Sequence, residues 1–287
     1  MEVPLSDLPS PTLDARLGRA HRIDALTDDA LYGAVGVRIA FTGRMGGVSS
    51  GPYASLNLGT HVSDDPSAVE ENRSRLASAL GAEAGSLIVP HQVHGDRLVC
   101  IGDGAARDLA AVRADVASGC DGVVCTAHGV PVLLNFADCL PLVLVSPTGA
   151  FCVVHAGWRG ALSGIAGAAA RRLAGTDIAL EAVPSDKRCA LFNAYIGPYI
   201  HAEAFETSSD VRDAFARRFG AAVAPDARHV DLGRAVAVDL VQAGVDPARI
   251  CDADICTFQH SSKYFSYRRS GGICGRHGAV AYREERG

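Results

Sequence analysis

The chain has 287 residues, of which 48% are hydrophobic and 21% are charged, a balance typical of a soluble globular protein. A formal net charge of −5 and the lack of any Lys- or Arg-rich run argue against a nucleic-acid partner. No stretch reaches the roughly 18 uninterrupted apolar residues of a membrane helix, and residues 1–30 lack the apolar core of a signal peptide. We therefore expect a cytoplasmic protein, monomeric or homodimeric, that binds neither nucleic acid nor membrane.

The cysteine content also suits a cytoplasmic protein. There are nine of them, scattered without a repeating framework, and an odd count without a framework suits reduced thiols better than disulfides. Most lie in apolar or strand-like stretches, where cysteine usually serves as a small buried hydrophobic residue.

The chain divides unevenly. Residues 1–34 contain three prolines and no sustained periodicity, which predicts a loosely ordered lead-in. Residues 35–287 show no internal repeat, low-complexity block or linker, so we expect one catalytic domain there.

Within that domain, strand and helix patterns alternate. Short apolar or alternating runs predict strands at 37–41, 87–89, 99–101, 130–136, 142–145, 151–154, 190–196, 264–268 and 279–282. Helical patterns lie at 66–80, 161–173, 204–219 and 232–243. The first helix has the clearest start, because Asp65 can cap free N–H groups and Pro66 suits the first turn. This order predicts an α/β (α+β) fold, a single-domain layered sandwich with a mixed β-sheet core covered by helices.

The strands at 142–145 and 151–154 are joined by a four-residue turn at 147–150, which predicts an antiparallel hairpin. If the turn is centred between its second and third residues, Leu142 lies opposite His155. Cys139 would lie opposite Trp158, so that Cys139 and His155 would both lie at the open end of the hairpin, where sites commonly form.

Three residues carry the clearest chemical signal, namely His94, Cys139 and His155. They lie in the segments His91-Gln92-Val93-His94-Gly95, Ala137-Asp138-Cys139-Leu140-Pro141 and Val154-His155-Ala156-Gly157-Trp158-Arg159-Gly160. Two imidazoles and a thiolate make a zinc ligand set that leaves a fourth tetrahedral position open, as in catalytic zinc sites. Zinc is the metal that we expect, with copper as the less favoured choice. Three unrelated packing residues remain the alternative.

Other residues near these motifs are candidates for supporting roles. Asp138 could orient a ligand imidazole or carry a proton, or it could only stabilise a turn. Arg159, ahead of a predicted helix, and Arg44, in a Gly-rich loop, could bind phosphate; an ion pair and a solvated loop charge are the alternatives. Asn57 could hold a ribose hydroxyl or cap a turn. His91 is a solvated loop residue, a partner of a ligand, or a fourth ligand.

Taken together, the motifs resemble those of the multicopper polyphenol oxidase, or laccase-domain, family, whose members are also described as purine nucleoside phosphorylases. The resemblance runs from about Val37 through nearly the whole chain. Its segments are Phe41-Thr42-Gly43-Arg44, Gly46-Gly47-Val48-Ser49, Ser55-Leu56-Asn57-Leu58-Gly59-Thr60-His61-Val62, Asp64-Asp65-Pro66, Asn72-Arg73, the three ligand segments, Ile196-Gly197-Pro198, Tyr264-Phe265-Ser266-Tyr267-Arg268-Arg269 and Gly275-Arg276.

The resemblance implies a single α/β sandwich domain with zinc bound by the residues that match His94, Cys139 and His155. It implies phosphorolysis of adenosine, inosine or methylthioadenosine to the base and ribose 1-phosphate, with adenosine deamination as a side activity. The partners would be a purine nucleoside and phosphate. Phe136 and Phe205 stand where the family commonly has Thr and Tyr, which leaves the substrate preference open.

Two other chemistries can be weighed from the residues. A copper oxidase of the laccase type needs a trinuclear centre built from many imidazoles, yet the ten histidines are dispersed and form no His-Xaa-His pair. Alternatively, Cys139 could be the nucleophile and His155 the base of a metal-free hydrolase or amidase that acts on a cell-wall precursor or a peptide. Such an enzyme would survive chelators, whereas a zinc enzyme would not.

Overall fold

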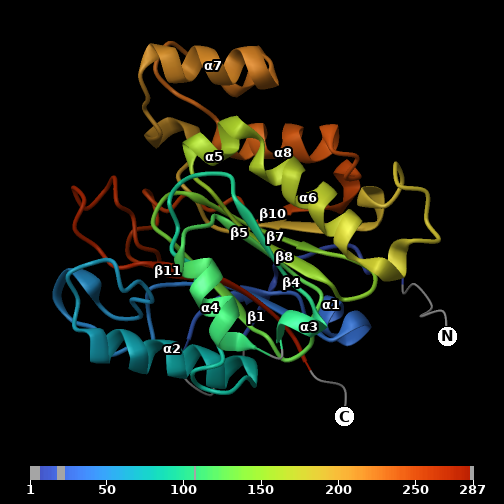
Figure 1. Cartoon of the computed structure of the whole chain (residues 1–287). Helices are drawn as coiled ribbons and strands as arrows, with labels where there is room; N and C mark the ends of the chain where they lie inside the picture. Colours follow the sequence, from blue (N-terminus) through green and yellow to red (C-terminus); the bar gives the residue numbers. More distant parts are fainter. Residues whose placement is uncertain (1–6, 18–22, 107, 285–287) are drawn as a thin grey trace.

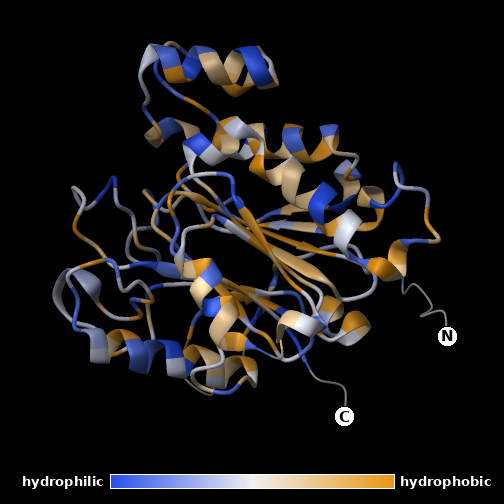
Figure 2. Cartoon of the chain, in the orientation of Figure 1, coloured by the Kyte–Doolittle hydropathy of each residue, from blue (hydrophilic) through white to orange (hydrophobic). Residues whose placement is uncertain are grey.

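Two β-sheets lie face to face at the centre of the molecule, and helices cover both outer faces (Figure 1). The computed structural model describes residues 7–17, 23–106 and 108–284. Apolar strands occupy the middle of this sandwich, while the polar residues gather on the helices and loops outside it (Figure 2). The expected α/β sandwich is confirmed, although the single mixed sheet of the prediction is replaced by two sheets.

The first sheet has five strands, and each pair of adjacent strands in it is antiparallel. In spatial order they are β1 (Ala15–Arg16), β2 (Ala25–Thr27), β3 (Val37–Thr42), β11 (His277–Arg283) and β6 (Val132–Phe136). The last strand of the chain therefore lies inside this sheet, between two earlier ones.

The second sheet has six strands and is mixed. In spatial order they are β10 (Ile250–Asp252), β9 (Asn193–Ile196), β7 (Leu140–Val145), β8 (Phe151–Ala156), β5 (Gly122–Cys125) and β4 (Leu98–Ile101). The two outermost pairs are parallel, whereas the inner pairs are antiparallel. Its central strands are buried along their whole length and are apolar except for His155 of β8, because they are covered on both faces.

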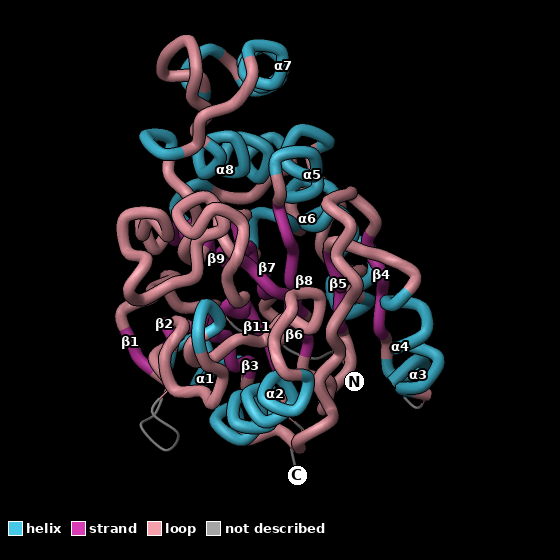
Figure 3. Tube along the Cα trace, turned by 90° about the vertical axis from the view of Figure 1, so that its left-hand side faces the viewer, coloured by secondary structure: helices cyan, strands magenta, loops and turns pink. Residues whose placement is uncertain are grey.

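Most helices lie on the two outer faces (Figure 3). The helix bounds are α1 (Asp29–Val35), α2 (Pro66–Leu80), α3 (Asp103–Ala106), α4 (Leu109–Ala117), α5 (Trp158–Ser163), α6 (Ile165–Thr176), α7 (Ser209–Phe219) and α8 (Leu232–Gln242). Side chains of α5, α6 and α8 pack on the second sheet, α7 packs on the outside of α5 and α8, and α2 packs on the first sheet. By contrast, α1, α3 and α4 pack against the core between the sheets, α3 and α4 beside β4. Within the described ranges, no helix is long and apolar enough to cross a bilayer.

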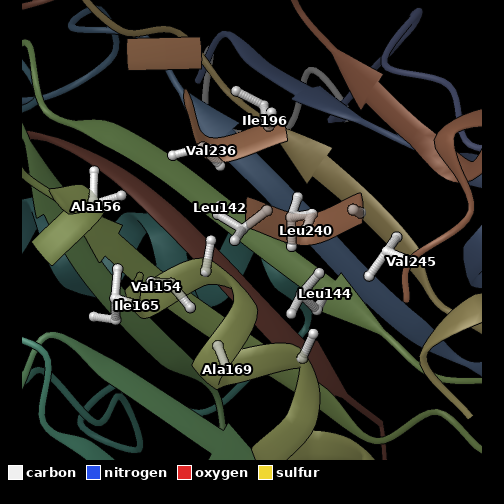
Figure 4. Close-up of a cluster of buried hydrophobic side chains, with 14 of the residues drawn as sticks. Leu142, Leu144, Val154, Ala156, Ile165, Ala169, Ile196, Val236, Leu240 and Val245 are labelled. Carbon is white, nitrogen blue, oxygen red and sulfur yellow. The ribbon is translucent and has the colours of Figure 1, made fainter. Parts of the chain in front are cut away.

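Strand alternation explains why three apolar cores form. In β8, Cys152 and Val154 face the helices, while Phe151 and Val153 face the other sheet. The layer between helices and sheet is drawn in Figure 4, where Leu142 and Leu144 of β7 meet Ala169 of α6 and Leu240 of α8. A third core lies between the first sheet and α2.

Local signals set the bounds of α2, which match the prediction for 66–80. The Asp65 side chain accepts a hydrogen bond from the Ser67 N–H, and Pro66 occupies the first position. Gly81 ends the helix in the left-handed conformation, with φ 76°. Each of these signals lies within one or two residues of the end that it sets.

Several other bounds differ from the prediction. The helix expected at 161–173 is two helices, α5 and α6, because Gly164 adopts a φ of 84° between them. The polar stretch after Ile101 folds into α3 and α4, which the pattern missed. The helix expected at 204–219 begins only at Ser209.

Two expected strands do not form. Residues 264–268 lie in turns, and the run at 87–89 makes one isolated bridge, from Ile88 to Val132. The strand expected at 190–196 begins only at Asn193, because a short 3₁₀ helix precedes it.

The expected lead-in at 1–34 is corrected in its described part, which contains β1, β2 and most of α1; residues 1–6 and 18–22 lie outside the described residues. Leu26 and Leu31 are buried in the core between the sheets. The buried Asp28 caps α1 and accepts a hydrogen bond from the Tyr195 hydroxyl of β9, at 2.8 Å. One side chain thus connects this segment to the second sheet.

The hairpin of β7 and β8 forms as expected, but its register differs by one residue. Pro141, rather than Leu142, lies opposite His155. The reason is the turn, which is centred on Thr148 and closed by a hydrogen bond from the Ser146 N–H to the Ala150 carbonyl. Continuing the observed register places Cys139 beside Gly157, closer to His155 than the predicted pairing would allow.

We predict that Leu144→Ala lowers the free energy of unfolding by about 2–5 kcal/mol, because Leu144 is fully buried between β7 and the helices. Urea titration followed by circular dichroism measures the change. The matched control is Ile178→Ala, since Ile178 is 77% exposed and its truncation should change the free energy by about 0.5 kcal/mol or less. Similar losses in the two variants would contradict this packing.

Candidate metal centre and its cavity

The fold brings together His94, Cys139 and His155. His94 lies in the loop before β4, Cys139 directly precedes β7, and His155 belongs to β8. Their ligand atoms lie within 4.8 Å of one another, and the two imidazole rings meet edge to face at 86°. Among residues 7–17, 23–106 and 108–284, this is the one group of three or more His, Cys, Asp or Glu side chains close enough to hold an ion.

A fourth residue, Asp121, fixes this arrangement and was missed by the sequence analysis. Its carboxylate is fully buried and lies 2.8 Å from Nδ1 of His155. The same carboxylate accepts hydrogen bonds from the N–H groups of Val93, His94 and Gly95, at 3.2, 2.9 and 2.8 Å. Asp121 directly precedes β5, so one side chain joins a strand end, the His94 loop and β8.

This contact also sets the protonation of His155. A carboxylate can only accept, so Nδ1 donates its proton to Asp121, and Nε2 is the nitrogen that would bind a metal on giving up its own proton. The sequence carries a weak signal for Asp121, a carboxylate between Gly119-Cys120 and an apolar strand, but nothing in the spacing connects it to His155.

The electrostatics of the group suit a thiolate ligand. Burial alone would raise the pKa of the Cys139 thiol, but the adjacent His155 and His94 outweigh it and lower the pKa to about 6. Burial alone would lower the pKa of His155, but the Cys139 sulfur and Asp121 raise it to about 9. A buried sulfur that favours its anionic form, beside two imidazoles, is the donor chemistry that zinc prefers.

Backbone geometry holds the ligands close. His94 has a positive φ of 60°, and Asp138, which directly precedes Cys139, has a positive φ of 89°. Gly157 lies against all three ligands: a Cβ atom there would be 3.1 Å from His94, 3.4 Å from His155 and 3.5 Å from the Cys139 sulfur. A methyl group at this position would press on the His94 ring and would come into ordinary contact with the other two side chains.

Asp138 does not orient a ligand imidazole; that position belongs to Asp121. Its Oδ1 accepts a hydrogen bond from the Thr257 hydroxyl and its Oδ2 accepts one from the Arg268 N–H, both at 2.7 Å. Its carbonyl oxygen accepts one from the Ile200 N–H. Asp138 lines the cavity, but its contacts are those of a residue that stabilises the surrounding loops.

The structure places Arg44 away from the cavity lining, so a phosphate-binding role is not supported. Its Nε donates to the Ala54 carbonyl at 2.8 Å and its Nη1 donates to the Ser261 carbonyl at 2.9 Å. The guanidinium also lies over the Phe265 ring, 4.5 Å from the centroid. These contacts connect two loops.

Asn57 is fully buried and, like Arg44, does not line the cavity. Its Nδ2 donates to the Gly59 carbonyl and to Asp64, and its Oδ1 accepts from the N–H groups of Gly59 and Arg276. The turn-capping alternative is the one observed, and the amide has no free group for a ribose hydroxyl.

A cavity of about 450 Å³ opens beside the three ligands. It is lined by His61, Gln92, His94, Asn135, Ala137, Asp138, Cys139, His155, Trp158, Arg159, Ile200, Phe205, Leu232, Tyr267, Arg268 and Arg276. Of the predicted phosphate residues, Arg159 is the one that lines it; this exposed side chain lies over the Trp158 ring, 4.3 Å from the centroid. His91 is exposed and stands outside both the ligand group and the lining.

The two departures from the family pattern have different positions. Phe205 lines the cavity, where it can contact a substrate. Phe136 is buried in the core between the sheets, and its ring lies 5.4 Å from that of His155. Phe136 therefore packs behind a ligand.

His61 and Arg276 also line the cavity, although the sequence analysis gave neither a role. A Cβ atom on Gly59 would lie 3.2 Å from His61 and 2.8 Å from Arg276, so both side chains pack against the same glycine. Desolvation, followed by the charge of Arg276, lowers the pKa of His61 to about 4. His61 is therefore neutral at physiological pH.

The chain is similar to known proteins over most of its length. A model of the family described as multi-copper polyphenol oxidoreductase laccase matches residues 38–284. A purine nucleoside phosphorylase of Pseudomonas aeruginosa is 36% identical over 243 residues, 82% of this chain and 88% of the relative. An adenosine deaminase from an unknown prokaryotic organism is 32% identical over 241 residues, 81% and 88% of the two chains.

The fold is shared as well. The crystal structure of YlmD from Geobacillus stearothermophilus superposes with a TM-score of 0.75 at 30% identity, covering 94% of this chain and 100% of that one. A hypothetical protein YfiH of Bacillus licheniformis gives a TM-score of 0.77 at 27% identity, covering 90% and 95%. On the extent of these matches, the chain belongs to the multi-copper polyphenol oxidoreductase laccase family.

Proposed function

We propose that the protein is a zinc-dependent enzyme of purine nucleosides. It cleaves adenosine, inosine or methylthioadenosine with phosphate to the free base and ribose 1-phosphate, and deaminates adenosine as a side activity. The observation that carries this proposal is the convergence of His94, Cys139 and His155 at the side of a cavity. Relatives named purine nucleoside phosphorylase and adenosine deaminase support the substrate class.

Two imidazoles and one thiolate would hold the ion, with Asp121 keeping the His155 ring in place. A bound zinc ion supplies Lewis-acid polarisation at the cavity. All nine cysteines are free, which suits the cytoplasm as the location that we propose.

The walls of the cavity suit the two substrates. Ile200, Phe205 and Leu232 form an apolar surface against which a purine ring can pack. Arg159 is exposed, lines the cavity and forms no ion pair with a described Asp or Glu, so its charge is free for the phosphate dianion. Burial of the base would place the glycosidic bond between the apolar wall and the ligand group.

The alternative hydrolase or amidase, acting on a cell-wall precursor or a peptide, rests on one specific observation. Cys139 is close to His155, which favours the thiolate and would also favour a nucleophile. Copper oxidase chemistry has less support, because a trinuclear centre would need more imidazoles than the described part of the chain gathers in one place.

Zinc removal separates these chemistries. We expect the purified protein to contain one zinc ion per chain by elemental analysis. It should convert adenosine to adenine only when phosphate is present, as chromatography can measure, and form a smaller amount of inosine. Dialysis against a chelator should abolish both reactions and added zinc should restore them, because the ion supplies the polarisation. Activity that survives metal removal but is lost on alkylation would favour the hydrolase, and a lack of both products would refute both nucleoside activities.

Cys139→Ser should remove zinc and turnover together, since a hydroxyl replaces the only thiolate ligand. Metal content and the rate of adenine release measure this. The control is Cys100→Ser, the same substitution at an exposed cysteine, which should keep both properties. Wild-type turnover in the Cys139 variant would show that the ligand assignment is wrong.

Asp121→Asn should weaken zinc binding or turnover by about 10- to 100-fold, because the amide keeps the shape of the carboxylate but loses the charge that polarises His155. Zinc affinity can be measured by competition with a chelating dye. Asp96→Asn, at an exposed position close to His94, should leave affinity unchanged. Equal affinities in the Asp121 variant and the wild type would remove Asp121 from the metal site.

A further inference from the structure

Asn135 places an unsatisfied hydrogen-bond acceptor at the cavity. The residue lines the cavity, is 5% exposed, and its Oδ1 is buried without a hydrogen-bond partner among the described residues. Leaving a buried amide oxygen unpaired costs free energy, so such a group usually has a reason to persist. A ligand in the cavity would give this oxygen its missing donor.

The position of Asn135 in β6 shows that it is not a core residue. Leu134 and Phe136 point into the core between the two sheets, while Leu133 points to the opposite face and packs with Leu58. Because side chains alternate along a strand, Asn135 shares the face of Leu133. On this face of β6, apolar Leu133 is followed by polar Asn135, and Asn135 lies where the face reaches the cavity.

The backbone of Asn135 is held firmly. Gln92 Nε2 donates to the Asn135 carbonyl at 2.9 Å, and the Asn135 N–H donates to Gln92 Oε1 at 2.8 Å. Gln92 lies two residues before His94, so this pair fixes Asn135 relative to the loop that carries a ligand. Because the backbone is already fixed, only the side-chain torsions of Asn135 need ordering when its amide binds a substrate.

The cavity has walls of different character on the two sides of the ligand group. The Asn135 side chain lies on the outer face of the first sheet, and Gln92 bonds to the Asn135 backbone at the edge of that sheet. Leu232 belongs to the core between the second sheet and its helices, and Phe205 packs against that core. His155 lies between these walls, because its ring packs on Phe136 in the middle core.

A nucleoside also has an apolar part and a polar part. Its base is flat and largely apolar, its ribose carries hydroxyl groups, and the bond broken in phosphorolysis joins the two. With the base on the Phe205 side, the ribose faces Asn135, and the reacting bond lies near the ligand group. An unpaired amide oxygen then meets the O–H donors of the sugar.

We infer that Asn135 Oδ1 accepts a hydrogen bond from the 2′- or 3′-hydroxyl of the ribose and so makes the enzyme selective for ribonucleosides. This inference rests on the proposed nucleoside chemistry. It gives to Asn135 the sugar-binding role that Asn57, with its amide fully used, cannot take.

The test compares kcat/KM for adenosine, 2′-deoxyadenosine and 3′-deoxyadenosine in the wild type and in Asn135→Leu, which keeps the size of the side chain and removes the amide. Adenosine should lose roughly tenfold in the variant, while the analogue that lacks the bonded hydroxyl should lose little. For each substrate, kcat/KM of the variant is divided by kcat/KM of the wild type, because deoxyribonucleosides differ from adenosine in intrinsic reactivity. Equal losses for all three substrates would overturn the inference.

Two further variants control the comparison. Asn135→Asp keeps an acceptor and should retain discrimination between adenosine and the sensitive analogue. Phe205→Leu, on the opposite wall, should lower kcat/KM for all three nucleosides by the same factor. Zinc content and thermal unfolding show whether each variant is folded.

If Asn135→Leu does not fold, wild-type affinities measured without phosphate decide the matter. Adenosine should bind roughly tenfold more tightly than one of the deoxynucleosides, and equal affinity for all three would refute the role of Asn135 alone. A wild-type enzyme that converts none of the nucleosides would refute the proposed function and this inference together.

Discussion

The site depends on one buried carboxylate. Asp121 accepts hydrogen bonds from three successive N–H groups around His94 and pairs with the His155 ring. A buried charge is tolerable only when it is satisfied in this way, and these contacts lower the pKa of Asp121 although burial opposes them. Loss of this charge would release the His94 loop and the His155 ring together. Asp121 therefore sets both the geometry of the three candidate ligands and the charge environment of the His155 imidazole.

The sandwich explains why residues so far apart in the chain can meet. β5, β8 and β7 are neighbours in the second sheet, so Asp121, His155 and Cys139 enter the site from adjacent strands. The core between the sheets ends at His155, where Phe136 packs on its ring. The rigid part of the site is therefore continuous with the packed interior, while the cavity walls come from loops and strand ends on both sides.

Sequence reasoning succeeded where the cause was local or chemical. The bounds of α2 follow from a cap, a proline and a glycine within a few residues, and the meeting of His94, Cys139 and His155 was predicted from the residue types that bind zinc. It failed where a side chain is used by a distant partner. Arg44 is engaged by carbonyls of Ala54 and Ser261, which no spacing reveals. Asp121 and Asn135 went unnoticed because a single polar residue beside an apolar run has no pattern until the strands are paired.

Gly157 has a consequence for how this site can be altered. A methyl group in its place would crowd the His94 ring, 3.1 Å away, and would come into ordinary contact with His155 and Cys139, so each further carbon atom there would press on the candidate ligands. Substitutions at the cavity wall, such as at Phe205, leave this contact untouched, so the wall can be changed without disturbing His94, Cys139 and His155.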